Sequence, residues 1–409
     1  MEQPVPVAVF DANQPPALAM TRSLGRAGVP VDVYSHEGIG AATVSRYARK
    51  RGSCPDPARA DVFLPWLEAR IRAGEIRLVA PTSDLIAFYA NELRHLFEDQ
   101  IRRAMPPSEN VLAALFKDRF GERLAAHGFA TPRSAFPLGL DEAVEAARAL
   151  RYPVVLKPRS HVAVGWARGL VVHDADELAR SYAAYPIGPE SRELVARYPE
   201  LRWPMLQEYV PGALDNLFSV SGLLGPDGTL IAASASRKLL QWPPKLGVGV
   251  IFECEVDAGL VALGTDAARK LLGAGLFEIE LIRDARTGEH LAIDLNPRAY
   301  GQITLDIARG VDLPRLWYES LFLGGMTEVA ARADVRWHHF WPFHVSHLAG
   351  IATGTGRAGR VADYVRQARA PHVDIANDWG DPLPNVIFAL NIWRHPGGLL
   401  RPFLQRGDG

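Results

Sequence analysis

The clearest pattern of hydrophobic and polar residues lies between Gly275 and Gly301. Apolar residues take every second position there, first Phe277, Ile279 and Leu281 around Glu278 and Glu280, and then Leu291, Ile293 and Leu295 among Ala292, Asp294 and Asn296. Because neighbouring side chains of a strand point to opposite faces, each half is predicted to be a strand with one apolar and one polar face. Residues 284–289 are rich in turn-forming types, so we expect the two strands to form a hairpin.

The polar face of this predicted hairpin carries candidate metal ligands. If Glu280 lies opposite Asp294, these two carboxylates and the amide of Asn296 converge beside Arg298. Magnesium prefers such oxygen ligands and usually keeps waters and substrate phosphates as well. A hairpin with a solvated acidic face would show the same pattern, so the rest of the chain has to decide between the two interpretations.

The first part of the chain shows the pattern of a parallel α/β sheet. Residues 5–10 and 29–34 are apolar runs typical of buried strands, and a helical pattern over residues 15–27 lies between them. Such a strand–helix–strand opening predicts a parallel sheet with a right-handed crossover. The turn after the first strand lacks the G-x-G-x-x-G pattern of dinucleotide-binding sheets.

Polar residues follow two strands of this predicted sheet. Asp11 and Asn13 come after the first strand, and Ser83 and Asp84 come after a strand at residues 76–80. Ligands of open α/β sheets bind at the carboxyl ends of the strands, so these side chains are candidates for ligand contact. Helix capping is the alternative explanation for Asn13 and Asp84.

The next predicted helix and strand each carry a lysine. A predicted helix with Ser108 as its N-cap carries Lys117, and a short apolar strand ends in Lys157. A loop at residues 160–169, with Gly165 inside it, follows that strand and can place backbone N–H groups over a polyphosphate. The Walker A motif G-x-x-x-x-G-K-[ST] is absent from the sequence.

The middle of the chain adds further strands. One short strand ends at Glu208, and Asp215 follows in the next turn. Residues 217–224 and 230–235 are predicted to form a hairpin across a glycine-rich turn, with Lys238 just beyond it. A helix is expected over residues 257–272.

Residues from about 330 onward differ in composition. Residues 337–344 are rich in aromatic and histidine side chains, and aromatic contact is favoured over metal binding because no histidine pair with a nearby acid is spaced as metal ligands are. Residues 386–393 and 399–404 are apolar and indicate a docking helix, consistent with a homodimer, and the region is expected to have a packing or substrate role.

Composition narrows the class of protein. The chain has 409 residues, of which 48% are hydrophobic and 22% charged, so we expect more than one globular domain. A net charge of −1 gives no reason to expect nucleic acid or a membrane as a partner. The two cysteines, Cys54 and Cys254, are far apart, and no secretory signal or spanning segment is visible, so a cytoplasmic protein is predicted.

Taken in order, these motifs resemble the ATP-grasp superfamily: Lys117, Lys157 with its loop, Glu208 with Asp215, Lys238, Glu280, and the Asp294-Leu-Asn-Pro-Arg298 stretch. Within it, the chain is most similar to the carboxylate–amine ligase-like proteins related to the large chain of carbamoyl-phosphate synthase. The resemblance implies an α/β and α+β fold. It would consist of a Rossmann-like parallel-sheet domain at residues 1–107, a two-subdomain ATP-grasp core at 108–329, and a small carboxy-terminal region at 330–409. The core would divide into a lid-side subdomain at 108–203 and a metal-side subdomain at 204–329.

The resemblance also implies contacts with ATP. The ATP phosphates would be bound by Lys117, Lys157, Ser160 and Gly165. The backbone of Glu208, Tyr209 and Val210 would contact adenine, and Asp215 would bind the ribose.

By the same resemblance, the polar hairpin would hold the metal and the reacting groups. Glu280, Asp294 and Asn296 would bind one or two Mg²⁺ ions, or Mn²⁺. Arg298 would stabilise the transferred phosphoryl group or the acyl phosphate, and Lys238 would contact the γ-phosphate or the substrate.

These implications predict an ATP-dependent ligase. It would phosphorylate a small-molecule carboxylate to an acyl phosphate and couple that group to an amine, with release of ADP and phosphate. Two alternatives stay open: an enzyme that phosphorylates a carboxylate or bicarbonate without an amine step, and an ATP-binding regulatory protein without turnover.

Overall fold

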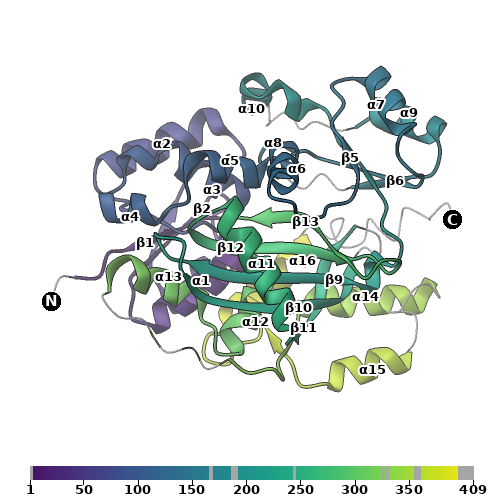
Figure 1. Ribbon diagram of the computed structural model, residues 1–409. Coiled ribbons are helices and arrows are strands. Elements are labelled where there is room, and N and C mark those ends of the chain that lie inside the picture. The colour runs from purple at the N-terminus through teal and green to yellow at the C-terminus, as the bar shows by residue number, and fades with distance from the viewer. Residues whose placement is uncertain are drawn as a thin grey trace.

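The structure, a computed structural model, describes residues 3–164, 169–185, 192–242, 246–323, 327, 329, 331–353 and 361–394. Within these residues the strands form three sheets, which we name the N-terminal, small and large sheets. Figure 1 shows the large sheet in the centre, the small sheet with its helices at the upper right, and the N-terminal helices at the left. No helix among the described residues is long and apolar enough to cross a membrane.

The N-terminal sheet is parallel, as the opening pattern predicts, and its strand order is β3–β2–β1–β4. All residues of its central strands are buried, and half of them are valines, which favour strands. The strands are β1 (Val7–Val9), β2 (Val31–Ser35), β3 (Ala48–Ser53) and β4 (Leu78–Val79). The helices of this part are α1 (Pro15–Arg26), α2 (Ala60–Arg72), α3 (Asp84–Glu92) and α4 (Asp99–Ala104), with short 3₁₀ helices η1 (Ala42–Val44) and η2 (Arg94–Leu96).

The small sheet is antiparallel, with strand order β5–β8–β6–β7. Its strands are β5 (Ser134–Ala135), β6 (Val154–Lys157), β7 (Leu170–Val172) and β8 (Met205–Glu208). Leu156 and Leu206 of this sheet are buried against Leu178 and Tyr182 in a core of their own. Helices α7 (Leu140–Ala147) and α9 (Ala175–Ala183) pack against it. Helices α8 (His161–Val164) and α10 (Arg192–Arg197) contact α3 and α2 of the N-terminal part, respectively, and η4 (Pro199–Arg202) follows α10.

The helix that carries Lys117 differs from the prediction. Ser108 does not cap it: α5 (Ser108–Leu115) starts at Ser108, and a separate helix, α6 (Lys117–Ala126), starts at Lys117. The chain is extended at the buried residue Phe116 between them, and the Lys117 N–H donates to the carbonyl of Arg159 at 2.8 Å. This break ties the start of α6 to the segment that follows Lys157.

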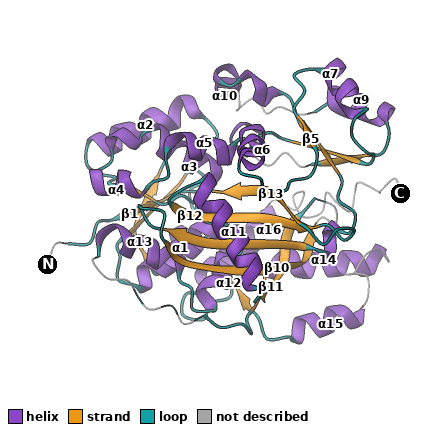
Figure 2. Cartoon of the chain, in the orientation of Figure 1, coloured by secondary structure: helices purple, strands orange, loops and turns teal. Residues whose placement is uncertain are grey.

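The large sheet has the strand order β13–β12–β9–β10–β11–β14–β15. Its neighbouring strands are antiparallel except for the last pair: β9 (Leu217–Leu224), β10 (Leu230–Trp242), β11 (Val248–Glu255), β12 (Gly275–Arg283), β13 (His290–Asn296), β14 (Arg336–His338) and β15 (Val373–Asp374). Helix α11 (Ala258–Leu271) lies across one face of this sheet, as Figures 1 and 2 show. The apolar residues Phe277 and Ile279 of β12 are buried beneath it, so the acidic side of β12 faces away from α11.

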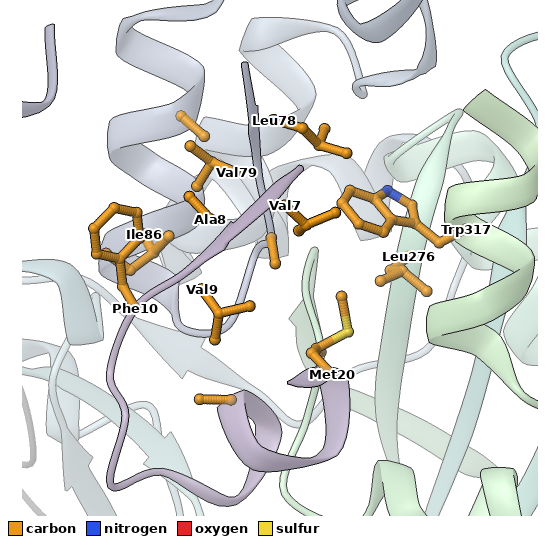
Figure 3. Close-up of a cluster of buried hydrophobic side chains, with 14 of the residues drawn as sticks. Val7, Ala8, Val9, Phe10, Met20, Leu78, Val79, Ile86, Leu276 and Trp317 are labelled. Carbon is orange, nitrogen blue, oxygen red and sulfur yellow. The ribbon is translucent and has the colours of Figure 1, made fainter. Parts of the chain in front are cut away.

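The N-terminal and large sheets share one hydrophobic core. Figure 3 shows Leu276 of β12 and Trp317 of α13 (Leu313–Phe322) beside Val7 and Leu78 of the N-terminal sheet. The strand that carries the candidate ligands is thereby packed directly against the N-terminal sheet. The short helices α12 (Ile303–Ala308) and η5 (Ala213–Asp215) also lie near the large sheet.

The carboxy-terminal region adds β14 and β15 to the large sheet and closes back onto the N-terminal part. Its helices are α14 (Phe340–Thr353), α15 (Val361–Arg369) and α16 (Leu383–Arg394). The rings of His338, Phe343 and His372 stack in this region, and Trp337 is buried. The apolar segment 386–393 lies within α16, whereas 399–404 lies outside the described residues.

Candidate active site

The predicted pairing in the hairpin is confirmed. Glu280 on β12 lies directly opposite Asp294 on β13, and Glu278 lies opposite Asn296. Residues directly opposite on an antiparallel pair have Cβ atoms about 5 Å apart, so each pair of side chains can act on one ligand.

The strict alternation predicted for β13 is wrong beyond Asp294, because the register shifts there by one residue. Glu280 pairs with Asp294, but Leu281 pairs with Ala292, which leaves Ile293 as the extra residue of a β-bulge. Ala292 therefore joins the core beneath α11, whereas Leu291 joins a separate cluster.

That separate cluster is an apolar patch beside the carboxylates. It contains Val210, Leu217, Ile282 and Leu291. Ile282 is two residues from Glu280 on a regular strand, so it lies on the same face of the large sheet. The predicted adenine contact, Val210, is thus placed next to an apolar surface that adjoins the candidate metal ligands.

A buried lysine pairs with Asp294. The Lys117 ammonium lies 2.5 Å from Asp294 Oδ1, and the Lys117 side chain is 7% exposed. Burial alone would raise the pKa of Asp294, but Lys117, His161 and Lys157 outweigh it and lower that pKa to about 2. Asp294 is therefore ionised across the physiological range.

Lys157 approaches the same carboxylates from the small sheet. Burial and the nearby charge of Lys117 lower the pKa of Lys157 to about 8, while Asp294 and Glu280 act in the opposite direction. Ser160 is buried, and its hydroxyl accepts a hydrogen bond from the Val162 N–H at 3.2 Å. Gly165 lies outside the described residues.

A third lysine comes from the large sheet itself. Lys238 is on β10, and its Nζ lies 3.9 Å from Glu280 Oε1. The structure thus brings Lys117, Lys157 and Lys238 together around Glu280 and Asp294, although the three lysines belong to three different elements.

Arg298 connects the hairpin to the N-terminal sheet. Its Nε lies 2.5 Å from Asp84 Oδ1, and its Nη2 donates to Asn296 Oδ1 at 2.8 Å. The neighbouring Ala299 N–H donates to the carbonyl of Pro81, just after β4, at 2.8 Å. The carboxyl end of the N-terminal sheet therefore meets the candidate metal ligands.

The capping explanation for Asn13 and Asp84 is wrong. Ser83 caps α3 by accepting from the Ile86 N–H, which leaves the Asp84 carboxylate to pair with Arg298. Burial opposes ionisation of Asp84, but Arg298 outweighs it, so the pKa of Asp84 is lowered. Asn13 Oδ1 accepts from the Ala41 N–H at 3.0 Å and from Asn391 Nδ2 at 2.9 Å.

Asp11 lies at the same edge of the N-terminal sheet. It has a φ of 54°, a left-handed conformation that is uncommon outside glycine but that aspartate tolerates. Burial raises the pKa of Asp11, while hydrogen bonding to Ser83 and the more distant charges of His36 and Arg298 act against this rise.

Glu208, assigned to the adenine contact, lies at the end of the small sheet away from Lys157, whereas Asp215, assigned to the ribose, contacts the large sheet. Val154 pairs with Glu208 and Lys157 pairs with Met205, so Glu208 and Lys157 are separated by roughly 10 Å along the strands. The Tyr209 N–H already donates to the carbonyl of Pro153 at 3.2 Å. Asp215 lies in η5, and its carbonyl accepts from Arg237 at 3.0 Å.

Sequence reasoning did not assign a role to Glu278. This side chain is 3% exposed, and its two oxygens accept hydrogen bonds from Asn296 and Gln302. Burial and the neighbouring Glu280 raise the pKa of Glu278 to about 7. The alternating pattern placed Glu278 on the polar face, but nothing in it could separate a buried acid from a partly exposed one.

The residues present fit a magnesium site of the phosphate-dependent kind. Among the described residues, no group of three or more histidine, cysteine, aspartate and glutamate side chains could hold a metal ion. The candidate set has instead two carboxylates, Glu280 and Asp294, and the amide of Asn296. Magnesium is commonly bound through one or two carboxylates together with waters and substrate phosphates.

Neither a protein-family model nor a curated protein matches this chain, but solved structures do. The biotin carboxylase domain of 2-oxoglutarate carboxylase from Hydrogenobacter thermophilus, solved with MgADP, ADP and bicarbonate, is 16% identical at a TM-score of 0.64, over 82% of this chain and 74% of that one. N5-carboxyaminoimidazole ribonucleotide synthetase, solved with ADP, is 12% identical at a TM-score of 0.64, over 97% and 98%. L-amino acid ligase from Bacillus licheniformis is 14% identical at a TM-score of 0.56, over 79% and 75%.

These similarities show that the chain has the ATP-grasp fold. The fold class predicted from the order of the motifs is therefore confirmed. The small sheet carries Lys157, and the large sheet carries Lys238, Glu280 and Asp294.

Proposed function

We propose that the protein is an ATP-dependent ligase that joins a small-molecule carboxylate to an amine and releases ADP and phosphate. The observation that carries this proposal is the convergence of Lys117, Lys157 and Lys238 on the paired carboxylates of Glu280 and Asp294. Cations from three elements around an acidic pair match a site for magnesium and a polyphosphate. The similarity to an L-amino acid ligase and to two structures solved with ADP supports the same class.

In the first step, a substrate carboxylate oxygen attacks the γ-phosphorus of ATP. A new O–P bond forms while the bond to the bridging oxygen breaks, so ADP leaves with that electron pair. Phosphoryl transfer depends mainly on positioning and on neutralisation of charge. Lys157 would supply positive charge from the small sheet, Lys117 from the start of α6, and Lys238 from the large sheet. Magnesium held by Glu280, Asp294 and Asn296 would neutralise phosphate charge.

In the second step, the nitrogen of an amine attacks the acyl carbon. A C–N bond forms, the C–O bond to phosphate breaks, and the amine gives up a proton. Arg298 would stabilise the leaving phosphate, since its guanidinium lies beside Asn296 where the N-terminal sheet meets the site. Water has to be kept from the acyl phosphate, and closing the small sheet onto the large sheet would exclude it.

The test is a screen for ADP and phosphate release over carboxylates and amines, with mass spectrometry of the products. Hydroxylamine is a useful second probe, because it traps an acyl phosphate as a hydroxamate without a specific amine. ADP release that requires both a carboxylate and an amine, with an amide product, supports the proposal.

Two results would replace the proposal. Release with a carboxylate or bicarbonate alone would favour the phosphorylating enzyme without an amine step, for which the bicarbonate in one similar structure is the supporting observation. ATP binding without release in any combination would favour a regulatory protein.

A further inference from the structure

Glu278 lies on the same face of β12 as Glu280 and is hydrogen-bonded to Asn296, one of the candidate metal ligands. Its Oε2 accepts a hydrogen bond from Asn296 Nδ2 at 3.0 Å, and its Oε1 accepts from Gln302 Nε2. Gln302 also reaches Ser219 Oγ, at 3.4 Å. Asn296 Oδ1, on the other side of the same amide, accepts from Arg298 at 2.8 Å.

This arrangement fixes which way the Asn296 amide points. An amide has a donor nitrogen and an acceptor oxygen of nearly the same size, whereas a guanidinium only donates hydrogen bonds. The Asn296 nitrogen donates to Glu278, whose two oxygens both accept, and the donating guanidinium of Arg298 contacts the Asn296 oxygen. Its oxygen then points to the side on which Arg298 lies, and a second lone pair of that oxygen is left for another partner.

We propose that Glu278 is a positioning residue for the ligase site: it holds the Asn296 amide with its oxygen facing the magnesium position. This inference rests on the proposed function. The two acids on the polar face of β12 then have separate tasks, because Glu280 binds metal and Glu278 orients a neighbour that binds metal. Residues that orient metal ligands typically change metal affinity by about 10- to 100-fold when they are replaced.

The surroundings of the two acids agree with this division. The Glu280 side chain is 28% exposed and lies near Lys238, so it is accessible to an incoming cation. Glu278 is 3% exposed, and both of its oxygens are engaged by amide donors. Direct coordination by Glu278 would require one of these oxygens to share itself between the metal and its present donor, or to give up that hydrogen bond.

The first variant is Glu278→Gln. The new amide can itself donate to Asn296, so it no longer requires the Asn296 nitrogen to face it, and the orientation of Asn296 then depends on Arg298. We expect Mn²⁺ affinity in the presence of ADP, followed by electron paramagnetic resonance, to fall about 10-fold, with the melting temperature kept near that of the wild type. Glu289→Gln, in the exposed turn of the same hairpin, removes the same charge and is expected to leave affinity unchanged.

The second variant is the exchanged pair, Glu278→Gln with Asn296→Asp. The two oxygens of an aspartate are equivalent, so its orientation no longer matters, and the amide introduced by Glu278→Gln can donate to it. We expect this double variant to regain Mn²⁺ affinity to within about 3-fold of the wild type, which is a strongly non-additive result.

Three outcomes overturn the inference. If Glu278→Gln binds Mn²⁺ as tightly as the wild type does, Glu278 does not orient Asn296, and the proposed function is untouched. If the Mn²⁺ affinity of the double variant stays as low as that of Glu278→Gln, Glu278 is a metal ligand itself or has only a structural role. If the wild type itself binds no Mn²⁺ with ADP, the proposed function fails together with the inference.

Discussion

Several charged side chains of the candidate site have a protein partner of opposite charge. Lys117 pairs with Asp294, Arg298 pairs with Asp84, and Lys238 approaches Glu280. Burying an unpaired charge is strongly unfavourable, so these contacts keep the site intact before ligands bind. Magnesium and phosphate offer the same charges new partners, and the effect of each residue on binding can therefore be predicted.

At the scale of the residue, we expect Glu280→Gln to lower turnover about 100-fold or more, because a neutral amide is a weak ligand for magnesium. Folding should be unaffected, since the side chain is partly exposed and glutamine has nearly the same shape. Steady-state ADP release at varied magnesium, together with a thermal melt, measures both. Full activity at ordinary magnesium concentrations would show that Glu280 is not a ligand.

The pKa of Lys157 makes nucleotide affinity depend on pH. With a pKa of about 8, this lysine loses its charge in the ligand-free protein as the pH rises through that value. We expect the affinity for ADP to fall over this range, since a neutral amine attracts phosphate far less. Calorimetric titrations of the wild type and of Lys157→Gln measure this, and parallel pH curves for the two proteins would contradict it.

The same shift has a defined effect on stability. The pKa of Lys157, about 8 in the folded chain, is lower than the roughly 10.4 of an unfolded chain. Between these values the unfolded chain binds more protons, so the contribution of Lys157 to the free energy of unfolding rises as the pH increases from the folded to the unfolded pKa. Denaturant unfolding of the wild type and of Lys157→Gln at several pH values measures whether this contribution to the free energy of unfolding rises with pH.

At the scale of the element, much of the hairpin could be predicted because period-two patterns report directly on strands. The pattern places Glu280 and Asp294 on polar faces, but the turn and a regular register would put Glu280 opposite Ile293, so the observed pairing with Asp294 depends on the bulge. The bulge at Ile293 could not be predicted, because a register shift depends on what each face packs against, not on the local sequence.

The contacts and the burial of each candidate residue could likewise not be predicted from the sequence. The break at Phe116, the pairing of Asp84 with Arg298 and the burial of Glu278 all depend on contacts between residues far apart in the chain. The lysines and acids could be named because their types suit phosphate and magnesium. Which of them touch one another is decided by how the three sheets are placed.

Two glycines in helices test how packing overrides helix propensity. A Cβ on Gly264 of α11 would overlap Val220 of β9, so Gly264→Ala should destabilise the protein by about 1–3 kcal/mol. A Cβ on Gly121 of α6 would meet only Phe136 at 3.7 Å, so Gly121→Ala should stabilise it by up to about 1 kcal/mol. Urea unfolding of both variants measures the difference, and the same sign for both would contradict the packing of α11.

At the scale of the whole molecule, the carboxy-terminal region holds the N-terminal part in place. Asp381 is buried and accepts hydrogen bonds from Arg22 Nε at 2.8 Å, Ser45 Oγ at 2.6 Å and the Arg46 N–H at 2.8 Å. Since β14 and β15 of the same region extend the large sheet, this contact joins the first and last parts of the chain.

We expect Asp381→Ala to destabilise the protein by about 3–5 kcal/mol, because it removes the carboxylate 2.8 Å from the buried guanidinium of Arg22 and leaves Asp378 at 3.8 Å. Asp363→Ala, which removes an exposed pair with Arg366, should change the free energy of unfolding by less than about 0.5 kcal/mol. Urea unfolding, with limited proteolysis of residues 370–394, compares the two. Equal effects would show that the Asp381 contact does not hold the two ends together.

The contact between Lys117 and Asp294 has a consequence for the order of ligand entry. A cation that occupies Asp294 displaces the ammonium of a nearly buried lysine, which then lacks a counter-ion until an anion arrives. A nucleotide alone attracts that lysine but leaves the aspartate uncompensated. Each ligand therefore frees a charged side chain that the other ligand can bind, so we expect the two to bind with positive cooperativity. By thermodynamic reciprocity, magnesium increases the affinity for nucleotide by the same factor as nucleotide increases the affinity for magnesium.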